Sequence, residues 1–120
     1  MDNFKVKAMK LADDIVVFAL FGKLDAFTVP ELEKTIQQYM DAQIYRYIFD
    51  LSKLTGITSA GMGFFTKLNG ITADKQGCIV ILRPVMGVKE TLDVFGLFRL
   101  LPLADDLDAA LEKIGKTKTG

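Results

Sequence analysis

Apolar residues occupy every second position over residues 4–9, at Phe4, Val6 and Ala8. Period two predicts a strand with one exposed face, which suits the edge of a sheet. Residues 15–21 are apolar at every position and predict a central strand that is covered on both faces. The short connection ends in Asp13 and Asp14, which predict a turn, so we expect these two strands to form a hairpin.

The start of a first helix is marked around Pro30. Thr28 is a candidate N-cap, and Glu31 follows three residues later, which is the spacing of a capping box. Pro30 falls in the first turn, where its missing N–H costs little. We therefore expect a helix over residues 29–43, with an apolar inner face made of Leu32, Ile36, Tyr39 and Met40.

The middle of the chain predicts a strand, a loop and a second helix. Residues 47–51 are mostly apolar and predict the strand, and residues 52–58 are expected to form the loop. Small residues fill positions 59–63, after which the helix is expected to continue over residues 64–74. One side of this helix is expected to carry Met62, Phe65, Leu68 and Thr72.

Residues 78–82 are short, apolar and rich in β-branched side chains, which predicts a buried fourth strand. Pro84 then breaks the strand. Apolar residues then follow at helical spacing and predict a third helix: Val85, Val88, Leu92 and Phe95. Gly96 is expected to stop this helix at the C′ position.

The last segment predicts one more helix. Residues 100–103 can form only a short strand or a loop, because Pro102 lacks an N–H donor. Asp105 is expected to cap the helix and Gly115 to end it, with an inner face of Leu107, Ala110, Leu111 and Ile114. Residues 116–120 are polar and read as a tail.

Strands and helices therefore follow one another in the order β-β-α-β-α-β-α-(β)-α. This alternation predicts an α/β fold whose sheet is rich in parallel pairs. A length of 120 residues fits a single domain with one core.

Composition removes several classes of function. The chain has no histidine and one cysteine, Cys78, so neither a Ser-His-Asp or Cys-His catalytic arrangement nor a Cys/His zinc site can be built. We therefore expect no catalytic residue, no metal and no cofactor, and we expect that the protein is not an enzyme. Cys78 opens an apolar run and is interpreted as a small buried hydrophobe.

Charge and hydropathy limit the classes of partner and the cellular locations that are expected for the protein. Fifteen basic residues balance fifteen acidic ones, whereas nucleic-acid binders usually carry a basic excess, so no nucleic-acid partner is expected. The first residues do not resemble a signal peptide, and the apolar run over residues 15–22 is shorter than the ~18 residues of a membrane span. We expect no membrane span and a cytoplasmic location.

The segment 56–63 joins a strand to a helix, where phosphate-binding loops occur. Met62 and Gly63 stand where a P-loop needs Lys and Ser or Thr, so nucleotide hydrolysis has no chemistry here. Ser59 has two interpretations. It is an N-cap, a role that Thr58 can also fill, or it is an exposed hydroxyl whose phosphate would lie on free N–H groups at the helix start.

Residues 22–27 connect the second strand to the first helix. They carry Lys23, Asp25 and Phe27. The structural interpretation is a turn with a solvated ion pair, and the functional one is a recognition loop that presents a charge and an aromatic ring.

Four segments, in this order and spacing, resemble the STAS domain of bacterial anti-sigma-factor antagonists: Gly22-x-Leu24-Asp25, Thr28-x-Pro30-Glu31-Leu32, Ile48-Phe49-Asp50-Leu51-Ser52 and Ser59-Ala60-Gly61-Met62-Gly63. The resemblance covers about residues 4–114. It implies a small single-domain fold, with a four- to five-stranded mixed sheet flanked by four helices. The STAS domain is expected to span residues 1–115, followed by the tail over residues 116–120.

The resemblance also implies a partner-switching function. An antagonist of this family binds an anti-sigma factor of the histidine-kinase-like ATPase class, which is itself a serine kinase and phosphorylates the antagonist. A serine phosphatase reverses the modification. The acceptor position falls on Ser59, with Thr58 as the fallback acceptor at a position where the family often has Asp.

The partner-binding surface is expected to combine the loop before the first helix with the exposed side of the second helix. Its expected residues are Lys23, Asp25, Phe27, Thr58, Ser59, Ala60, Gly61, Met62, Gly63, Phe64 and Lys67. The alternative function is a STAS scaffold, or a module that senses a small ligand such as a lipid or nucleotide, without a phosphorylation switch.

Overall fold

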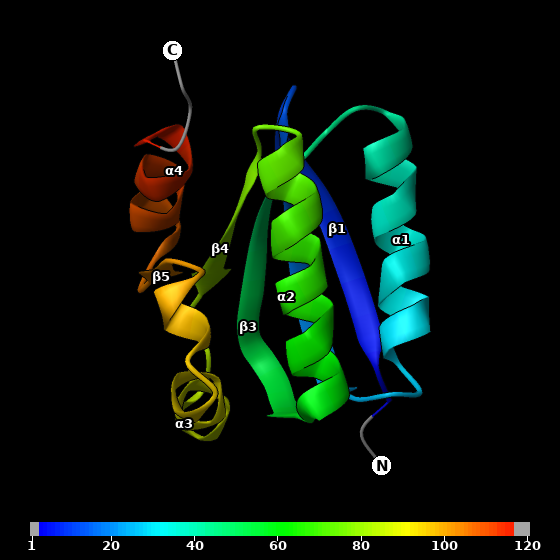
Figure 1. Ribbon diagram of the computed structural model, residues 1–120, viewed down its shortest axis with the longest axis vertical. Coiled ribbons are helices and arrows are strands. Elements are labelled where there is room, and N and C mark those ends of the chain that lie inside the picture. Colours follow the sequence, from blue (N-terminus) through cyan, green and yellow to red (C-terminus); the bar gives the residue numbers. More distant parts are fainter. Residues whose placement is uncertain (1–2, 117–120) are drawn as a thin grey trace.

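The structure, a computed structural model, describes residues 3–116 (Figure 1). In chain order its elements are β1 (Lys5–Ala12), β2 (Ile15–Leu24), α1 (Val29–Asp41), β3 (Arg46–Ile57), α2 (Ser59–Asp74), β4 (Cys78–Leu82), α3 (Met86–Val94), the 3-10 helix η1 (Leu97–Arg99), β5 (Leu103–Ala104) and α4 (Leu107–Lys116). The predicted α/β class and order of elements are therefore confirmed.

The strands form one five-stranded mixed sheet in the order β1-β2-β3-β4-β5. β1 is antiparallel to β2, and the following pairs are parallel. The half-exposed β1 lies at one edge, and the turn at Asp13 and Asp14 closes the predicted hairpin. The parallel strands β2, β3 and β4 therefore end on the same side of the molecule, where β3 leads into α2 (Figure 1).

The predicted loop over residues 52–58 is wrong, because β3 continues through Ile57. The residues beyond Leu51 pair with the end of β2, where Phe21 lies opposite Lys53 and Leu24 lies opposite Ile57. Two register shifts in this pairing interrupt the alternation of apolar and polar positions. Periodicity along the chain therefore did not reveal this part of the strand.

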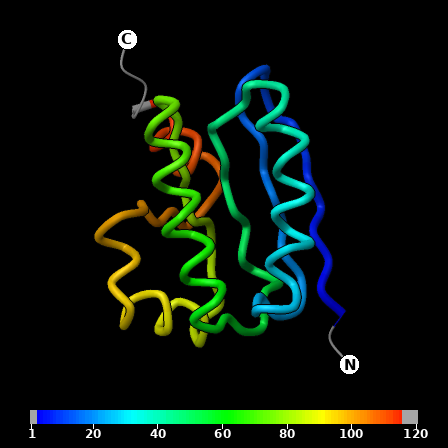
Figure 2. The backbone as a smooth tube through the Cα atoms, turned by 45° about the vertical axis from the view of Figure 1, so that its right-hand side comes forward, coloured from blue at the N-terminus to red at the C-terminus, as the bar shows by residue number. Residues whose placement is uncertain are grey.

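The two faces of the sheet are covered unequally. α1 and α2 lie side by side over one face (Figure 2) and enclose the larger apolar cluster. The rings of Phe18 and Phe49 stack there with centroids 5.3 Å apart, and Phe65 meets Phe49 edge-on at 5.1 Å. Such aromatic pairs add about 0.5–1.5 kcal/mol beyond their burial. α4 packs on the other face through Ala110 and Ile114.

One predicted helix cap is correct in its position only, and another is wrong. Thr28 occupies the predicted N-cap position of α1, but its side chain makes no capping bond, so it forms no capping box with Glu31. α4 is capped by Asp106 and not by Asp105, since the Ala109 backbone N–H donates to Asp106 Oδ1 at 2.8 Å. Adjacent aspartates present the same sequence signal, and only the backbone path decides which carboxylate reaches the amide.

The other helix ends follow the predictions more closely. Gly96 has a left-handed φ of 75° and stops α3, as predicted. α1 ends at Asp41, and α4 continues through Lys116, past the predicted stop at Gly115. The remainder of the predicted tail, residues 117–120, lies outside the described residues. The predicted inner face of α2 is confirmed by the burial of Met62, Phe65, Leu68 and Thr72.

Candidate functional site at the start of α2

α2 begins at Ser59, directly after the end of β3. The Ser59 side chain is exposed, and its hydroxyl has no hydrogen-bond partner among residues 3–116. Thr58 occupies the N-cap position with an extended backbone, but its side chain forms no capping bond. The Thr58 hydroxyl lies instead 3.4 Å from the carbonyl oxygen of Leu24. Neither hydroxyl caps the helix, and Ser59 is the more accessible of the two.

The first turn of α2 favours negative charge. It contains no acidic residue, and no side chain caps its amides. The first N–H groups of a helix have no intrahelical acceptor and carry positive partial charge. An anionic group on Ser59 would therefore be stabilised by these amides and would meet no carboxylate within the same turn.

The loop between β2 and α1 is shaped by Asp25. Its Oδ1 accepts hydrogen bonds from the backbone N–H groups of Phe27 at 2.9 Å and Thr28 at 3.1 Å. The Thr28 hydroxyl donates to the carbonyl oxygen of Lys23 at 2.9 Å. These bonds fix the loop and leave the Phe27 side chain 91% exposed. Asp25 thus supports the loop from within, while Lys23 and Phe27 face outward.

This loop and the start of α2 are neighbours in space. The Thr58 backbone N–H donates to the carbonyl oxygen of Leu24 at 3.0 Å. A Cβ atom on Gly61 would lie 3.1 Å from the same oxygen and 2.6 Å from Cγ1 of Ile57. The helix can approach β2 this closely only because residue 61 is glycine. The structure therefore brings together the two segments in which sequence reasoning placed the site.

The predicted partner residues of α2 divide into accessible and buried ones. Those that are exposed or partly exposed are Thr58, Ser59, Ala60, Gly63 and Lys67. The predicted surface positions of Gly61, Met62 and Phe64 are wrong, because all three residues are buried. Phe64 is only 5% exposed, since its ring packs edge-on against Phe49 and Phe65 in the core.

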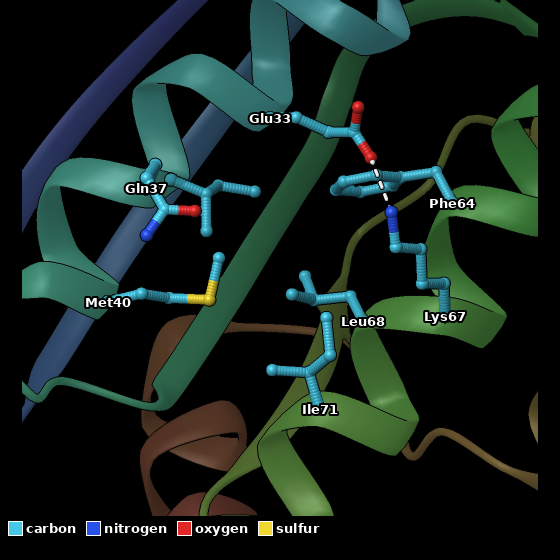
Figure 3. Close-up of a pocket in the computed structure, with 8 residues that line it drawn as sticks. Glu33, Gln37, Met40, Phe64, Lys67, Leu68 and Ile71 are labelled. Carbon is cyan, nitrogen blue, oxygen red and sulfur yellow. Dashed lines mark hydrogen bonds and ion pairs between the residues drawn. The ribbon is translucent and has the colours of Figure 1, made fainter.

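A groove of about 250 Å³ lies between α1 and α2 (Figure 3). Nζ of Lys67 and Oε2 of Glu33 form an ion pair of 3.5 Å across its rim, and both side chains are well exposed, so the pair contributes little stability. Lys67 also belongs to the exposed side of α2, so the groove adjoins the candidate site. Its lining residues are Glu33, Ile36, Gln37, Met40, Phe64, Lys67, Leu68 and Ile71.

Sequence reasoning missed a group of exposed apolar side chains around α3. Of the residues predicted on the inner face, Val88 and Leu92 are buried, whereas Val85 and Phe95 are exposed. Met86, Val94 and Leu100 are apolar residues outside the predicted inner face, and the structure exposes all three. Their presence outside that face was the sequence signal that could have revealed this exposed group. A hollow of about 550 Å³ lies beside them and is lined by Met86, Lys89, Glu90, Asp93, Phe98 and Leu103.

From the sequence, we also expect no membrane span and no metal site. No helix within residues 3–116 is long and apolar enough to cross a membrane. In the same part of the chain, no three His, Cys, Asp or Glu side chains come together as a metal site. Cys78, which was expected to be buried, is partly buried.

The model of one protein family, described as the STAS domain, matches residues 7–110. This chain belongs to the STAS domain family. The matched residues of the STAS domain run from β1 into α4 and include both the loop after β2 and the start of α2. The family resemblance seen in the four sequence segments is therefore confirmed.

Relatives of this STAS domain are named as anti-sigma factor antagonists. BtrV from Bordetella bronchiseptica, a candidate antagonist by its name, is 24% identical over 102 residues, which cover 85% of this chain and 88% of BtrV. The structure of unphosphorylated SpoIIAA, an anti-sigma factor antagonist, has a TM-score of 0.79 at 19% identity and covers 93% of this chain and 97% of its own.

A second solved structure, an anti-sigma factor antagonist from Mycobacterium paratuberculosis, has a TM-score of 0.82 at 20% identity. The alignment covers 94% of this STAS domain and 95% of that protein. At identities this low, the structural similarity shows a shared fold and no more. The two structures confirm the predicted small STAS fold, with its mixed sheet and flanking helices.

Proposed function

We propose that this STAS domain is an anti-sigma factor antagonist, which binds an anti-sigma serine kinase and is released when Ser59 is phosphorylated. The observation that carries the proposal is the exposed Ser59 hydroxyl at the start of α2, beside the end of β2, which carries Lys23, and the loop that presents Phe27. The names of BtrV and SpoIIAA support the same function, and SpoIIAA has also been solved in a phosphorylated form.

Ser59 is the preferred acceptor over Thr58. The Thr58 side chain is half-buried, and its hydroxyl is directed to the carbonyl oxygen of Leu24. Phosphorylation of Thr58 would break this contact between α2 and β2, whereas the exposed Ser59 hydroxyl has no such contact to lose. The amides of the first turn of α2 would then hold the phosphate, so the folded domain tolerates the modification.

The switch acts through charge at the partner-binding surface. In the unmodified state this surface combines the exposed ring of Phe27 with the open start of α2, where no acidic residue lies in the first turn. A phosphate adds about −1.5 to −2 charge there. A loss of about 3–5 kcal/mol of binding free energy would weaken the complex roughly 10²–10³-fold or more, which is sufficient for release.

The partners follow from this arrangement. An anti-sigma factor of the histidine-kinase-like ATPase class adds the phosphate, and a serine phosphatase removes it, both in the cytoplasm. The STAS domain itself supplies the acceptor hydroxyl and the binding surface, and contributes no catalytic group.

Ser59 substitutions test the proposal with the anti-sigma kinase of the same organism. Ser59→Ala should bind the kinase like the wild type and accept no phosphate, while Ser59→Asp should bind at least about tenfold more weakly. Gln38→Asp adds the same charge at an exposed position on α1 and should leave binding unchanged. If Ser59→Asp binds as tightly as Gln38→Asp, the phosphorylation switch is wrong.

The alternative, a small-ligand sensor, gains no specific support from the surface hollows. The groove of about 250 Å³ between α1 and α2 is smaller than the about 300–1,000 Å³ usual for ligand pockets. The hollow beside α3 is larger but mixes Lys89 with Glu90 and Asp93. Native mass spectrometry of the purified protein tests this alternative, which predicts a ligand that co-purifies with the chain.

A further inference from the structure

The sheet face opposite α1 and α2 is covered by α4 over only part of its length. The apolar contacts of α4 reach Val17, Ile48 and Val80 on neighbouring strands. In the next row across the sheet, Leu82 on β4 is still buried in this cluster, whereas Lys7, Ala19 and Asp50 on the other three strands are exposed or partly exposed. Beyond this row, no helix of the described chain packs on this face.

The strand register gathers lysines on this uncovered surface. Lys5 on β1 and Lys53 on β3 both lie opposite Phe21 on β2, so the three side chains form one row. Lys23 lies opposite Gly56 in the last row, with its aliphatic carbons 3.5–3.8 Å from where a Gly56 Cβ would be. Lys7, which pairs with Ala19, adds a fourth lysine from the preceding row. We call Lys5, Lys7, Phe21, Lys23 and Lys53 the lysine patch.

The charges of the lysine patch have no acidic partners within residues 3–116. The nearest carboxylate in the rows, Asp50, is paired with Arg83 at 3.3 Å. No salt bridge reaches any of the four lysines in the described part of the chain. The whole chain has zero net charge, so this face is a local excess of positive charge and the rest of the molecule carries a net negative charge.

The fold does not require this arrangement. Lysines on an edge strand discourage pairing with other chains, which accounts for Lys5 and Lys7 on β1. Lys23 and Lys53 lie on β2 and β3, which are interior strands of the sheet, so edge protection does not explain them. Lys23 lies opposite Gly56 and Lys53 opposite Phe21, so no cross-strand ion pair within the sheet explains them either, which points to a role outside the folding of the domain.

We propose that the lysine patch binds an acidic segment of a protein partner. Charge complementarity selects an anionic ligand, and carboxylates are the anionic groups that an unmodified protein segment supplies. The ammonium groups of Lys5 and Lys7 lie 5.6 Å and 5.5 Å from the centre of the Phe21 ring, so the ring orients two of the cations. Phe21 is partly buried beneath them and is not free to stack on nucleobases or to insert into a lipid bilayer.

The position of Lys23 favours a protein over the other polyanions. Lys23 belongs to the lysine patch and lies near the end of β2, where its carbonyl oxygen accepts a hydrogen bond from Thr28 in the loop that presents Phe27. A protein that contacts this loop can extend an acidic segment around the end of the sheet onto the lysine patch. Neighbouring strands are about 4.8 Å apart, so Lys5 and Lys53 flank a span of roughly 10 Å, which an extended acidic segment can follow.

Amide NMR spectra of the full chain, titrated with a short glutamate-rich peptide, test this proposal. Shifts should concentrate at the five residues of the lysine patch, and affinity should fall as NaCl rises from about 20 to about 150 mM. The variant Lys5→Gln/Lys53→Gln should bind about tenfold more weakly. The control Lys34→Gln/Lys89→Gln removes two exposed lysines from α1 and α3 and should bind like the wild type.

Equal binding by the patch and control variants would overturn the proposal, as would shifts confined to other surfaces. Stronger binding at the lysine patch by oligothymidylate, or by vesicles of phosphatidylcholine and phosphatidylserine, would also overturn it. Lys7→Gln/Lys23→Gln provides a second test if the first patch variant loses its dispersed spectrum. None of these variants changes Ser59, so failure here leaves the proposed phosphorylation switch to its own test.

Discussion

A matched pair of glycine substitutions tests how α2 is positioned at the candidate site. Gly61 and Gly63 lie in the same part of the helix, and in both cases alanine should gain about 0.5–1 kcal/mol from helix propensity. Their surroundings differ. A Cβ on Gly63 would have no neighbour within 4 Å, whereas one on Gly61 would lie 2.6 Å from Cγ1 of Ile57 and 3.1 Å from the carbonyl oxygen of Leu24.

The two substitutions should therefore change stability in opposite directions. Gly63→Ala should raise the free energy of unfolding by about 0.5–1 kcal/mol. In Gly61→Ala the backbone oxygen of Leu24 cannot move away without shifting β2, so overpacking of about 1–3 kcal/mol should exceed the propensity gain. For a chain of this size, each kcal/mol corresponds to roughly 3–6 °C in Tm.

Urea and thermal unfolding of both variants measure this difference. Equal stability of Gly61→Ala and Gly63→Ala would refute the close approach of α2 to β2. The stabilised Gly63→Ala variant then has a second use, because its added methyl group lies on the exposed side of α2. A loss of about 1 kcal/mol in kinase binding, roughly fivefold, would indicate that a partner approaches the helix at this glycine.

Two further predictions concern the loop and the core. Asp25→Ala should lower the free energy of unfolding by about 0.5–1.5 kcal/mol in urea denaturation, because the carboxylate that accepts from the backbone N–H groups of Phe27 and Thr28 is lost; a neutral effect would contradict this role. Burial, with a smaller contribution from Tyr45, raises the pKa of Tyr47 far above its ordinary value of about 10. The unfolded chain therefore loses this proton at lower pH than the folded chain, so stability should decline above about pH 10 by up to about 1.4 kcal/mol per pH unit. Tyr47→Phe should flatten this decline of the unfolding free energy with pH. If the slope is the same in the variant and the wild type, Tyr47 is not its cause.

Elements with a regular pattern were predictable from the sequence. The strand Cys78–Leu82 is bounded by Gly77 and by Arg83-Pro84, and its predicted ends are the observed ones. The second half of β3 was not predictable, because Ser52 and Thr55 fall at register shifts and are not paired one-to-one with β2. Its strand conformation depends on a neighbour that is distant in sequence.

The sequence indicated where the candidate site lies, but not which of its residues are exposed. Local segments located Ser59 and the loop that presents Phe27, and the family resemblance set their expected roles. Phe64 was misplaced because α2 is covered by both the sheet and α1, so adjacent Phe64 and Phe65 are both buried. A single helical stripe cannot indicate burial on two sides. The lysine patch arises from cross-strand register, which residue spacing along the chain does not contain.

The phosphorylation switch is the central claim, and binding of the phosphorylated protein tests it most directly. The anti-sigma kinase of the same organism, supplied with ATP, should modify the wild-type chain at Ser59, as shown by mass spectrometric mapping. Calorimetric titration should then show that the phosphorylated form binds the kinase at least about a hundredfold more weakly than the unmodified form. Equal affinity of the two forms, or a phosphate that maps away from Ser59, would contradict the account.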